Sequence, residues 1–453
     1  MAGTLLKTIL LLKSAVDELG IPMPLRDVER IGIMVNKAMS TQARSFHTAE
    51  HIFNLVRSGK PLQTMAAIFH DIVYFTIDEG FIPEIEAVLE RYIYIQDRKV
   101  FIRDDLDPEI VCVRGALGVF GFQPGDELPA FGGMNEFLST LVFIHEFQHS
   151  MDHPSLLEVI AYIEATIPFR PANKLGQTPP EALAERLRRI NRKYGVGLGD
   201  EIITAIVQSA VLFANTDVEN FAEEDVAAFL DNTWKLLPET NPSLRTTGLY
   251  TVKNYRIALQ KMEGFMNFLD PALIFSDYHG VPGKAELDSL NIRAKRNIMA
   301  ARDYLGIKLL TTGILEAIAE ISGGDVPIAL LMGDISDAQS LEKFESMLPQ
   351  LQVLEGASIT STVFRLLAYG RREDSSFDLN RSPLAKFIYM HIGTSHMKKY
   401  LTPLAEMFKG ERSPEDFLDA LPLDLIAPVV SACAAMAFTR SDELKAFISS
   451  RGV

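Results

Sequence analysis

The sequence predicts an all-α protein made of two helical domains, or of one large helical body. Apolar residues recur at three- and four-residue intervals along most of the chain, as on the buried face of an α-helix. The two-residue alternation that is typical of half-buried strands is scarce. With 453 residues, the chain exceeds what one ordinary hydrophobic core accommodates, so two domains are the first expectation.

The elements of the first domain are bounded by glycine and proline. A first helix covers 3–19 and ends at Gly20, and Pro22 and Pro24 form a turn before the second. The Ser58-Gly59-Lys60-Pro61 loop separates two short apolar helices, and the glycine-rich stretch 118–134 is expected to be an ordered loop. Further helices are expected over 26–39, 82–97, 108–117, 135–149, 155–167, 181–194, 199–214, 222–237 and 246–269.

Pro271 and the Gly280-Val-Pro-Gly283 turn mark the expected boundary between the domains. The predicted domains are therefore 1–275 and 276–453, and the second has no predicted role. Its apolar segments are 291–305, 307–321, 326–333, 340–354, 358–369, 383–408, 414–420 and 423–450.

Composition and charge narrow the function. The formal charge of −15 argues against binding of a nucleic-acid duplex, which needs a basic face. An anionic small substrate stays compatible with this charge, because a bound metal supplies local positive charge. The two cysteines are far apart and the longest apolar runs are interrupted by charges, so we expect a cytoplasmic protein without a membrane span. The oligomeric state, including a homo-oligomer, is left open.

Two short segments carry the metal-binding residue types. His47 and His51 are four positions apart, which on a helix places them on one face. His70-Asp71 ends the apolar run Met65-Ala-Ala-Ile-Phe69, where an isolated charge would be costly. Imidazole with carboxylate suits Mn, Fe, Zn or Mg, so the pattern indicates a divalent-metal site with one or two ions.

These segments resemble the HD superfamily of metal-dependent phosphohydrolases. The first motif, Phe-His47-xxx-His51-Ile followed by Phe-His70-Asp71-Ile-Val-Tyr, is similar to the small bacterial members, and its histidine spacing also occurs in cyclic-nucleotide phosphodiesterases. Weaker matches follow in the same order, so that the resemblance covers about 25–235. They are Asn135-Glu136-x-x-Ser139, Ile163-x-x-Thr166 and Asn215-x-Asp217.

The resemblance implies a fold, an activity and site residues. It implies an HD-type helical first domain that hydrolyses a phosphoester in a phosphorylated small molecule, with a nucleotide as the expected substrate, by a metal-activated water. It assigns His51, His70, Asp71 and Asp217 as metal ligands. His47 is the expected general acid, and Arg44, one turn earlier, is expected to hold a phosphate oxygen.

The segment His145-Glu146-Phe-Gln-His149 allows two interpretations. It has the H-E-x-x-H form of zinc proteases, in which both histidines bind zinc and the glutamate acts as base. Alternatively, His145 with His149 or His153 completes a second metal site of the HD type. Pro154 soon breaks the chain, which disfavours the protease.

Two further functions are left open by the sequence. The long second domain is compatible with a nucleotide-sensing signalling module that has no turnover. The additional histidines are also compatible with a di-iron oxygenase of the HD fold. Iron content and oxygen dependence distinguish the oxygenase, and nucleotide binding without turnover distinguishes the sensor.

Overall fold

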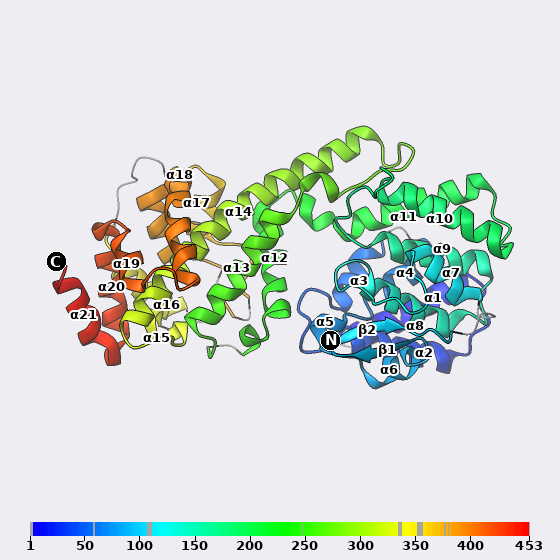
Figure 1. Cartoon of the computed structure of the whole chain (residues 1–453), viewed down its shortest axis with the longest axis horizontal. Coiled ribbons are helices and arrows are strands. Elements are labelled where there is room, and N and C mark those ends of the chain that lie inside the picture. Colours follow the sequence, from blue (N-terminus) through cyan, green and yellow to red (C-terminus); the bar gives the residue numbers. More distant parts are fainter. Residues whose placement is uncertain are drawn as a thin grey trace. The chain divides into compact units, whose positions relative to one another are not determined.

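The computed structural model of the chain confirms the all-α prediction (Figure 1). It describes residues 3–57, 59–106, 111–246, 248–333, 338–350, 357–375, 377–378 and 380–452. Within these residues, the strands β1 (Ile93–Gln96) and β2 (Lys99–Ile102) form the only sheet, a two-stranded antiparallel hairpin. The predicted segments 108–117 and 340–354 extend partly outside the described residues.

Contacts divide the chain into two compact units, which differ from the predicted domains 1–275 and 276–453. Unit 1 comprises 1–222 and 270–292, and unit 2 comprises 223–269 and 293–453. The predicted boundary rested on proline and glycine at 271–283, but this segment packs on unit 1, where Asn215 exchanges two hydrogen bonds with the backbone of Ser276. The chain therefore crosses between the units more than once, which a single boundary does not describe.

Unit 1 surrounds the buried helix α4. Every residue from Met65 to Phe69 has no exposed surface. This helix packs against α1, α8 and α9, so its C-terminal end delivers His70 into the interior. The helices of unit 1 are α1 (Thr4–Glu18), α2 (Leu25–Ala38), α3 (Ala49–Leu55), α4 (Pro61–Phe69), α5 (Phe75–Asp78), α6 (Pro83–Leu89), α7 (Val111–Phe120), α8 (Met134–Phe147), α9 (His153–Ala165), α10 (Pro179–Tyr194) and α11 (Asp200–Asp217).

The predicted helix 82–97 is wrong beyond residue 89. Helix α6 ends at Leu89, and the following residues form the β1–β2 hairpin. Asp97 and Arg98 at its turn both have positive φ, as a tight two-residue hairpin turn requires. In β1 only Ile93 is buried, and in β2 buried Val100 and Ile102 flank half-buried Phe101, so the sequence had no sustained two-residue alternation to indicate strands.

Unit 2 is helical and has a buried polar centre. The Asp378 carboxylate accepts hydrogen bonds from Trp234 Nε1 and Tyr255 Oη, and the Lys308 ammonium lies 3.5 Å away. Its helices are α12 (Val226–Thr240), α13 (Val252–Phe268), the greater part of α14 (Lys284–Ile321), α15 (Ile328–Met332), α16 (Ala338–Ser346), α17 (Thr362–Tyr369), α18 (Pro383–Phe408), α19 (Pro414–Asp419), α20 (Leu423–Met436) and α21 (Ser441–Ser449).

Helix α14 merges two predicted helices that were separated at Gly306. A Cβ atom at Gly306 would stand 2.7 Å from the sulfur of Met397, so this glycine permits close helix packing and does not end the helix. Within the described residues, no single helix combines the length and apolar content of a membrane span. The pair Leu423–Met436 and Phe438–Ser449 passes such a test only together, and it is bent by 119°.

Candidate metal centre

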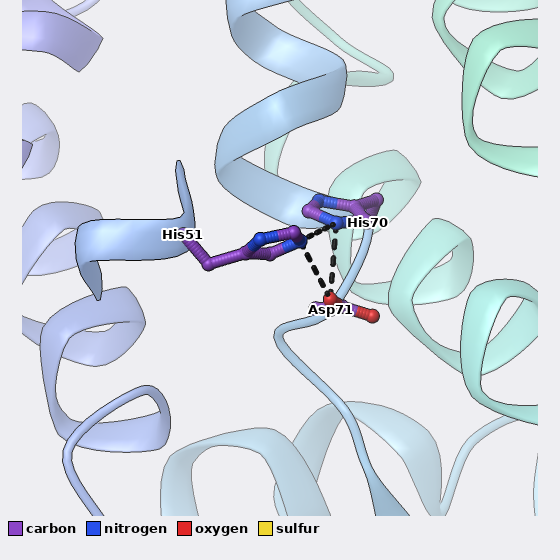
Figure 2. Close-up of side chains that lie close together, drawn as sticks. All are labelled: His51, His70 and Asp71. Carbon is purple, nitrogen blue, oxygen red and sulfur yellow. Dashed lines mark hydrogen bonds and ion pairs between the residues drawn. The ribbon is translucent and has the colours of Figure 1, made fainter. Parts of the chain in front are cut away.

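Four polar side chains from three segments of unit 1 converge beside α4. His51 comes from α3, His70 and Asp71 from the end of α4, and Asp217 from the last turn of α11. Figure 2 shows the imidazoles of His51 and His70 directed toward each other and toward Asp71, with 3.3 Å between their Nε2 atoms. The structure thus brings together all four residues that the resemblance assigns as the first metal's ligands.

The spacing of these atoms suits a cation held by His51, His70 and Asp71, whose ligand atoms all lie within 4.8 Å of one another, with Asp217 close to both imidazoles. The Asp71 Oδ2 atom lies 3.0 Å from His70 Nε2 and 3.5 Å from His51 Nε2, and Asp217 Oδ1 lies 2.9 Å from His51 Nε2 and 3.5 Å from His70 Nε2. Ligand atoms that each stand 2.0–2.2 Å from a tetrahedral metal ion are roughly 3.3–3.6 Å apart. Two nitrogen and two carboxylate donors form a set that divalent transition metals accept.

The surroundings of His70 prepare its Nε2 atom for a ligand role. His70 is 1% exposed, and its Nδ1 lies 3.0 Å from the carbonyl oxygen of Ala67 one turn earlier in α4. A ring N–H that donates to this carbonyl leaves the Nε2 lone pair directed at the cluster. Helix α4 therefore determines both the position and the tautomer of this histidine.

The two carboxylates depend on nearby positive charge. Burial lowers the pKa of His70, but the adjacent Asp71 and Asp217 outweigh it and hold this pKa well above its ordinary value. Burial alone would raise the pKa of Asp71, yet His70 keeps it far below its usual range. Asp217 Oδ1 is buried without a hydrogen-bond partner in satisfactory geometry among the described residues. A bound cation would stabilise these charges and give that oxygen a partner.

His47 lies beside the cluster, but not on the helix that the sequence predicted. Helix α3 begins at Ala49, and Thr48 before it is extended, with φ −107° and ψ 174°. His47 and His51 are therefore not one helical turn apart, although their rings are 6.0 Å apart between centroids. The ring of His47 packs edge-on against Tyr74 at 4.7 Å. This position borders the four-residue cluster and differs from that of a ligand.

The phosphate role predicted for Arg44 does not match its position. Its side chain has no exposed surface and forms an ion pair with Asp78, with Nη2 2.6 Å from the carboxylate. Its Nη1 donates to the carbonyl oxygen of Asp71 at 2.7 Å, and its Nη2 approaches that of Ile72 at 3.4 Å. Arg44 therefore holds the backbone that carries a metal ligand, and its guanidinium group is buried against Asp78.

Helix α8 holds the other side of the same loop. Ser139 accepts a hydrogen bond from the backbone N–H of Val73, and Asn135 accepts one from that of Phe75. Glu136 is on the same turn as Asn135. Its burial, and then the charge of Asp71, raise its pKa to about 7. The sequence motif contained Glu136, but its role was missed, because only the fold places it close to His70 and Asp71.

The raised pKa of Glu136 predicts a pH-dependent cost to stability. A carboxyl whose pKa rises on folding from 4.5 to about 7 binds its proton more tightly in the folded state. The free energy of unfolding therefore falls as pH rises through this window. We expect Glu136→Gln to raise the melting temperature of metal-free protein progressively from pH 4.5 to 7, relative to the wild type. Glu201→Gln, at an exposed first-turn position of α11, should give a small difference that does not change with pH.

The second metal site predicted from His145 and His149 is not formed. Among the described residues, the metal-type side chains whose ligand atoms group together are those of the four-residue cluster, and neither His145 nor His149 belongs to such a group. His145 is nine residues after Glu136 on α8, which places it about 13 Å further along the helix and on its opposite side. His149 follows the end of α8 and is exposed. The di-iron alternative loses these histidines as ligands.

The structure also disfavours the zinc-protease interpretation of this segment, because Glu146 is not free to act as the general base. The side chain of Glu146 is 5% exposed, and both of its oxygens accept hydrogen bonds from Arg30 of α2. A carboxylate bound in this bidentate way is part of the α2–α8 contact. We therefore expect Glu146→Gln to keep metal content and catalytic activity within about twofold of the wild type, measured by elemental analysis and turnover. Loss of activity in this variant, with retention in His70→Ala, would instead support the zinc protease.

Comparison of the chain with protein-family models, with curated proteins and with solved structures finds no match.

Proposed function

We propose that unit 1 binds one divalent metal ion and hydrolyses a phosphoester. The observation that carries this proposal is the convergence of His51, His70, Asp71 and Asp217, with nitrogen-to-oxygen distances of 2.9–3.5 Å. The phosphoester, and a nucleotide as its expected form, follow from the resemblance of these motifs to the HD superfamily. A divalent ion held by these residues would supply a Lewis acid and a nucleophilic water at neutral pH.

The chain's own residues have separate tasks in this proposal. The four ligand side chains fix the ion against the end of α4. Arg44, Asn135 and Ser139 position the 71–75 loop through its backbone. His47, which borders the cluster, protonates the departing alkoxide as general acid. Glu136 lies close enough to His70 and Asp71 for their charges to influence its carboxyl group.

The activity is tested directly. Purified protein loaded with Mn²⁺ or Mg²⁺ is incubated with nucleoside monophosphates, cyclic nucleotides and simple phosphomonoesters. Released phosphate or nucleoside is measured, or the nucleoside monophosphate that forms from a cyclic nucleotide. We expect turnover that chelation by EDTA removes and added metal restores. Tight nucleotide binding without turnover would favour the sensing module. Iron content with oxygen-dependent turnover would favour the oxygenase.

The variant His47→Ala distinguishes a general-acid role of His47 from a role as metal ligand. Loss of a general acid slows the chemical step by about 10²- to 10⁴-fold, whereas the four ligands stay in place. We therefore expect His47→Ala to keep one metal ion per chain while kcat falls by at least about 100-fold. The loss should be smaller for a substrate whose leaving group is acidic, such as 4-nitrophenol. Loss of the metal in this variant would contradict the assignment.

A further inference from the structure

Unit 1 contains a cavity that lies apart from the candidate metal centre. It is a cavity of about 360 Å³ between α9, α10, α11 and the segment 272–291, within the size range of small-molecule sites. Its apolar walls include Ile167, Phe169, Val211 and Phe275. This size and lining suit a small molecule with an apolar ring system.

The cavity uses a different face of α11 from the metal centre. Val211, Ala214, Asn215 and Val218 line the cavity and are spaced as one helical face. The metal centre instead contacts the helix face that carries Phe213 and Asp217. The ring of Phe213 is 6.4 Å from that of His70. The cavity is therefore a separate site that shares a wall with the metal centre.

An unbalanced positive charge borders the cavity. Glu164, which is 1% exposed, accepts hydrogen bonds from both Arg170 and Arg186 through the single oxygen Oε1. One carboxylate thus balances only one of two guanidinium groups, and Arg170, itself a lining residue, is a quarter exposed. Asp277 also lines the cavity but is exposed, so water screens its charge.

Two buried polar atoms of the lining residues also lack a hydrogen-bond partner within the described part of the chain. Glu164 Oε2 and Asn291 Oδ1 are buried and have no hydrogen-bond partner among the described residues. An unmatched buried acceptor costs about 1–3 kcal/mol, so such atoms call for a donor from a ligand or water. Two acceptors beside a surplus cation indicate a ligand that has both a hydrogen-bond donor and a negative charge.

We infer that this cavity binds a small organic anion, in which a flat apolar body bears one acidic group that pairs with Arg170 and a hydrogen-bond donor for Glu164 or Asn291. The apolar walls take the body and Arg170 takes the acid. This site is independent of the proposed hydrolysis, because its ligand meets neither His70 nor Asp217.

The test uses two fluorescent probes with the full chain. One is 8-anilinonaphthalene-1-sulfonate, which has fused rings, an N–H donor and one sulfonate. The other is N-phenyl-1-naphthylamine, which has the same rings and donor without the sulfonate. Binding is measured by fluorescence titration. We compare wild type with Arg170→Gln, with the cavity-filling Ala214→Phe, and with the control Arg192→Gln, whose exposed arginine is elsewhere on α10.

We expect one sulfonate probe to bind per chain. Arg170→Gln should raise its Kd about tenfold and leave the neutral probe unchanged, as loss of a charge-assisted contact predicts. Ala214→Phe should weaken both probes, and neither Arg192→Gln nor His70→Ala should affect them. Sulfonate binding that persists in Ala214→Phe, equal weakening of both probes by Arg170→Gln, or no binding at all would overturn the inference. Neutral-probe binding also reports whether the Arg170 variant is folded.

Discussion

His70→Ala is expected to leave the protein without its metal and without hydrolytic activity. His70 contributes one of two nitrogen ligands, and its ring is fixed by burial and by the Ala67 carbonyl. Loss of an outer partner of a ligand costs about 10- to 100-fold in metal affinity, so loss of the ligand itself should cost at least about 100-fold. Metal content measured by elemental analysis should fall from one ion per chain to a trace, and phosphate release should fall with it.

Two further variants make this test specific. Asp217→Asn preserves the size of the side chain and should show the same loss, which separates ligand removal from a cavity left in the core. His149→Ala changes an exposed histidine outside the cluster and should keep one ion per chain. Normal metal content in His70→Ala, or its loss in His149→Ala, would show that the metal is bound elsewhere.

The metal-type cluster was predictable from the sequence because its residue types and their spacing are unusual in an apolar segment. A histidine and an aspartate at the end of the apolar run Met65–Phe69 have no other evident source of stabilisation, and the paired histidines and Asp217 occur in the order of the motifs that the chain resembles. The structure brings these four residues together, although they come from separate segments. Side chains with strong chemical demands are thus the part of a site that a sequence reveals best.

The supporting residues were not predictable, because their roles depend on tertiary contacts. Arg44 was assigned to a phosphate because it precedes His47 by three residues in the sequence. In the structure it is buried, where it forms an ion pair with Asp78 and donates a hydrogen bond to the carbonyl oxygen of Asp71. His145 was assigned to a second metal from its place between Asp71 and Asp217 in the order of the HD-type motifs, but the length and rotation of α8 place it away from the cluster. Periodicity predicts which residues share a helix face, but not which neighbour that face meets.

Arg44→Met is expected to destabilise unit 1 and weaken metal binding together. The side chain of Asp78, paired with Arg44, is only 13% exposed, so removal of Arg44 leaves a largely buried carboxylate with Thr41 as its remaining partner. Breaking a buried ion pair in this way costs about 3–5 kcal/mol. For a unit of this size, that cost corresponds to a fall in melting temperature of roughly 6–20 °C. Metal affinity should fall about 10- to 100-fold, because the Asp71 carbonyl loses its donor.

The double variant Arg44→Met/Asp78→Leu distinguishes a positioning role from substrate binding. It removes both charges and keeps the volume of the pair, so most of the lost stability should return. The hydrogen bond to the Asp71 carbonyl does not return, so metal affinity should stay low and kcat should recover when metal is in excess. A residue that held a substrate phosphate would behave differently: KM would rise in both variants at saturating metal, because neither change replaces the guanidinium. The dependence of KM and kcat on metal concentration therefore decides whether Arg44 acts through Asp71 or on the substrate itself.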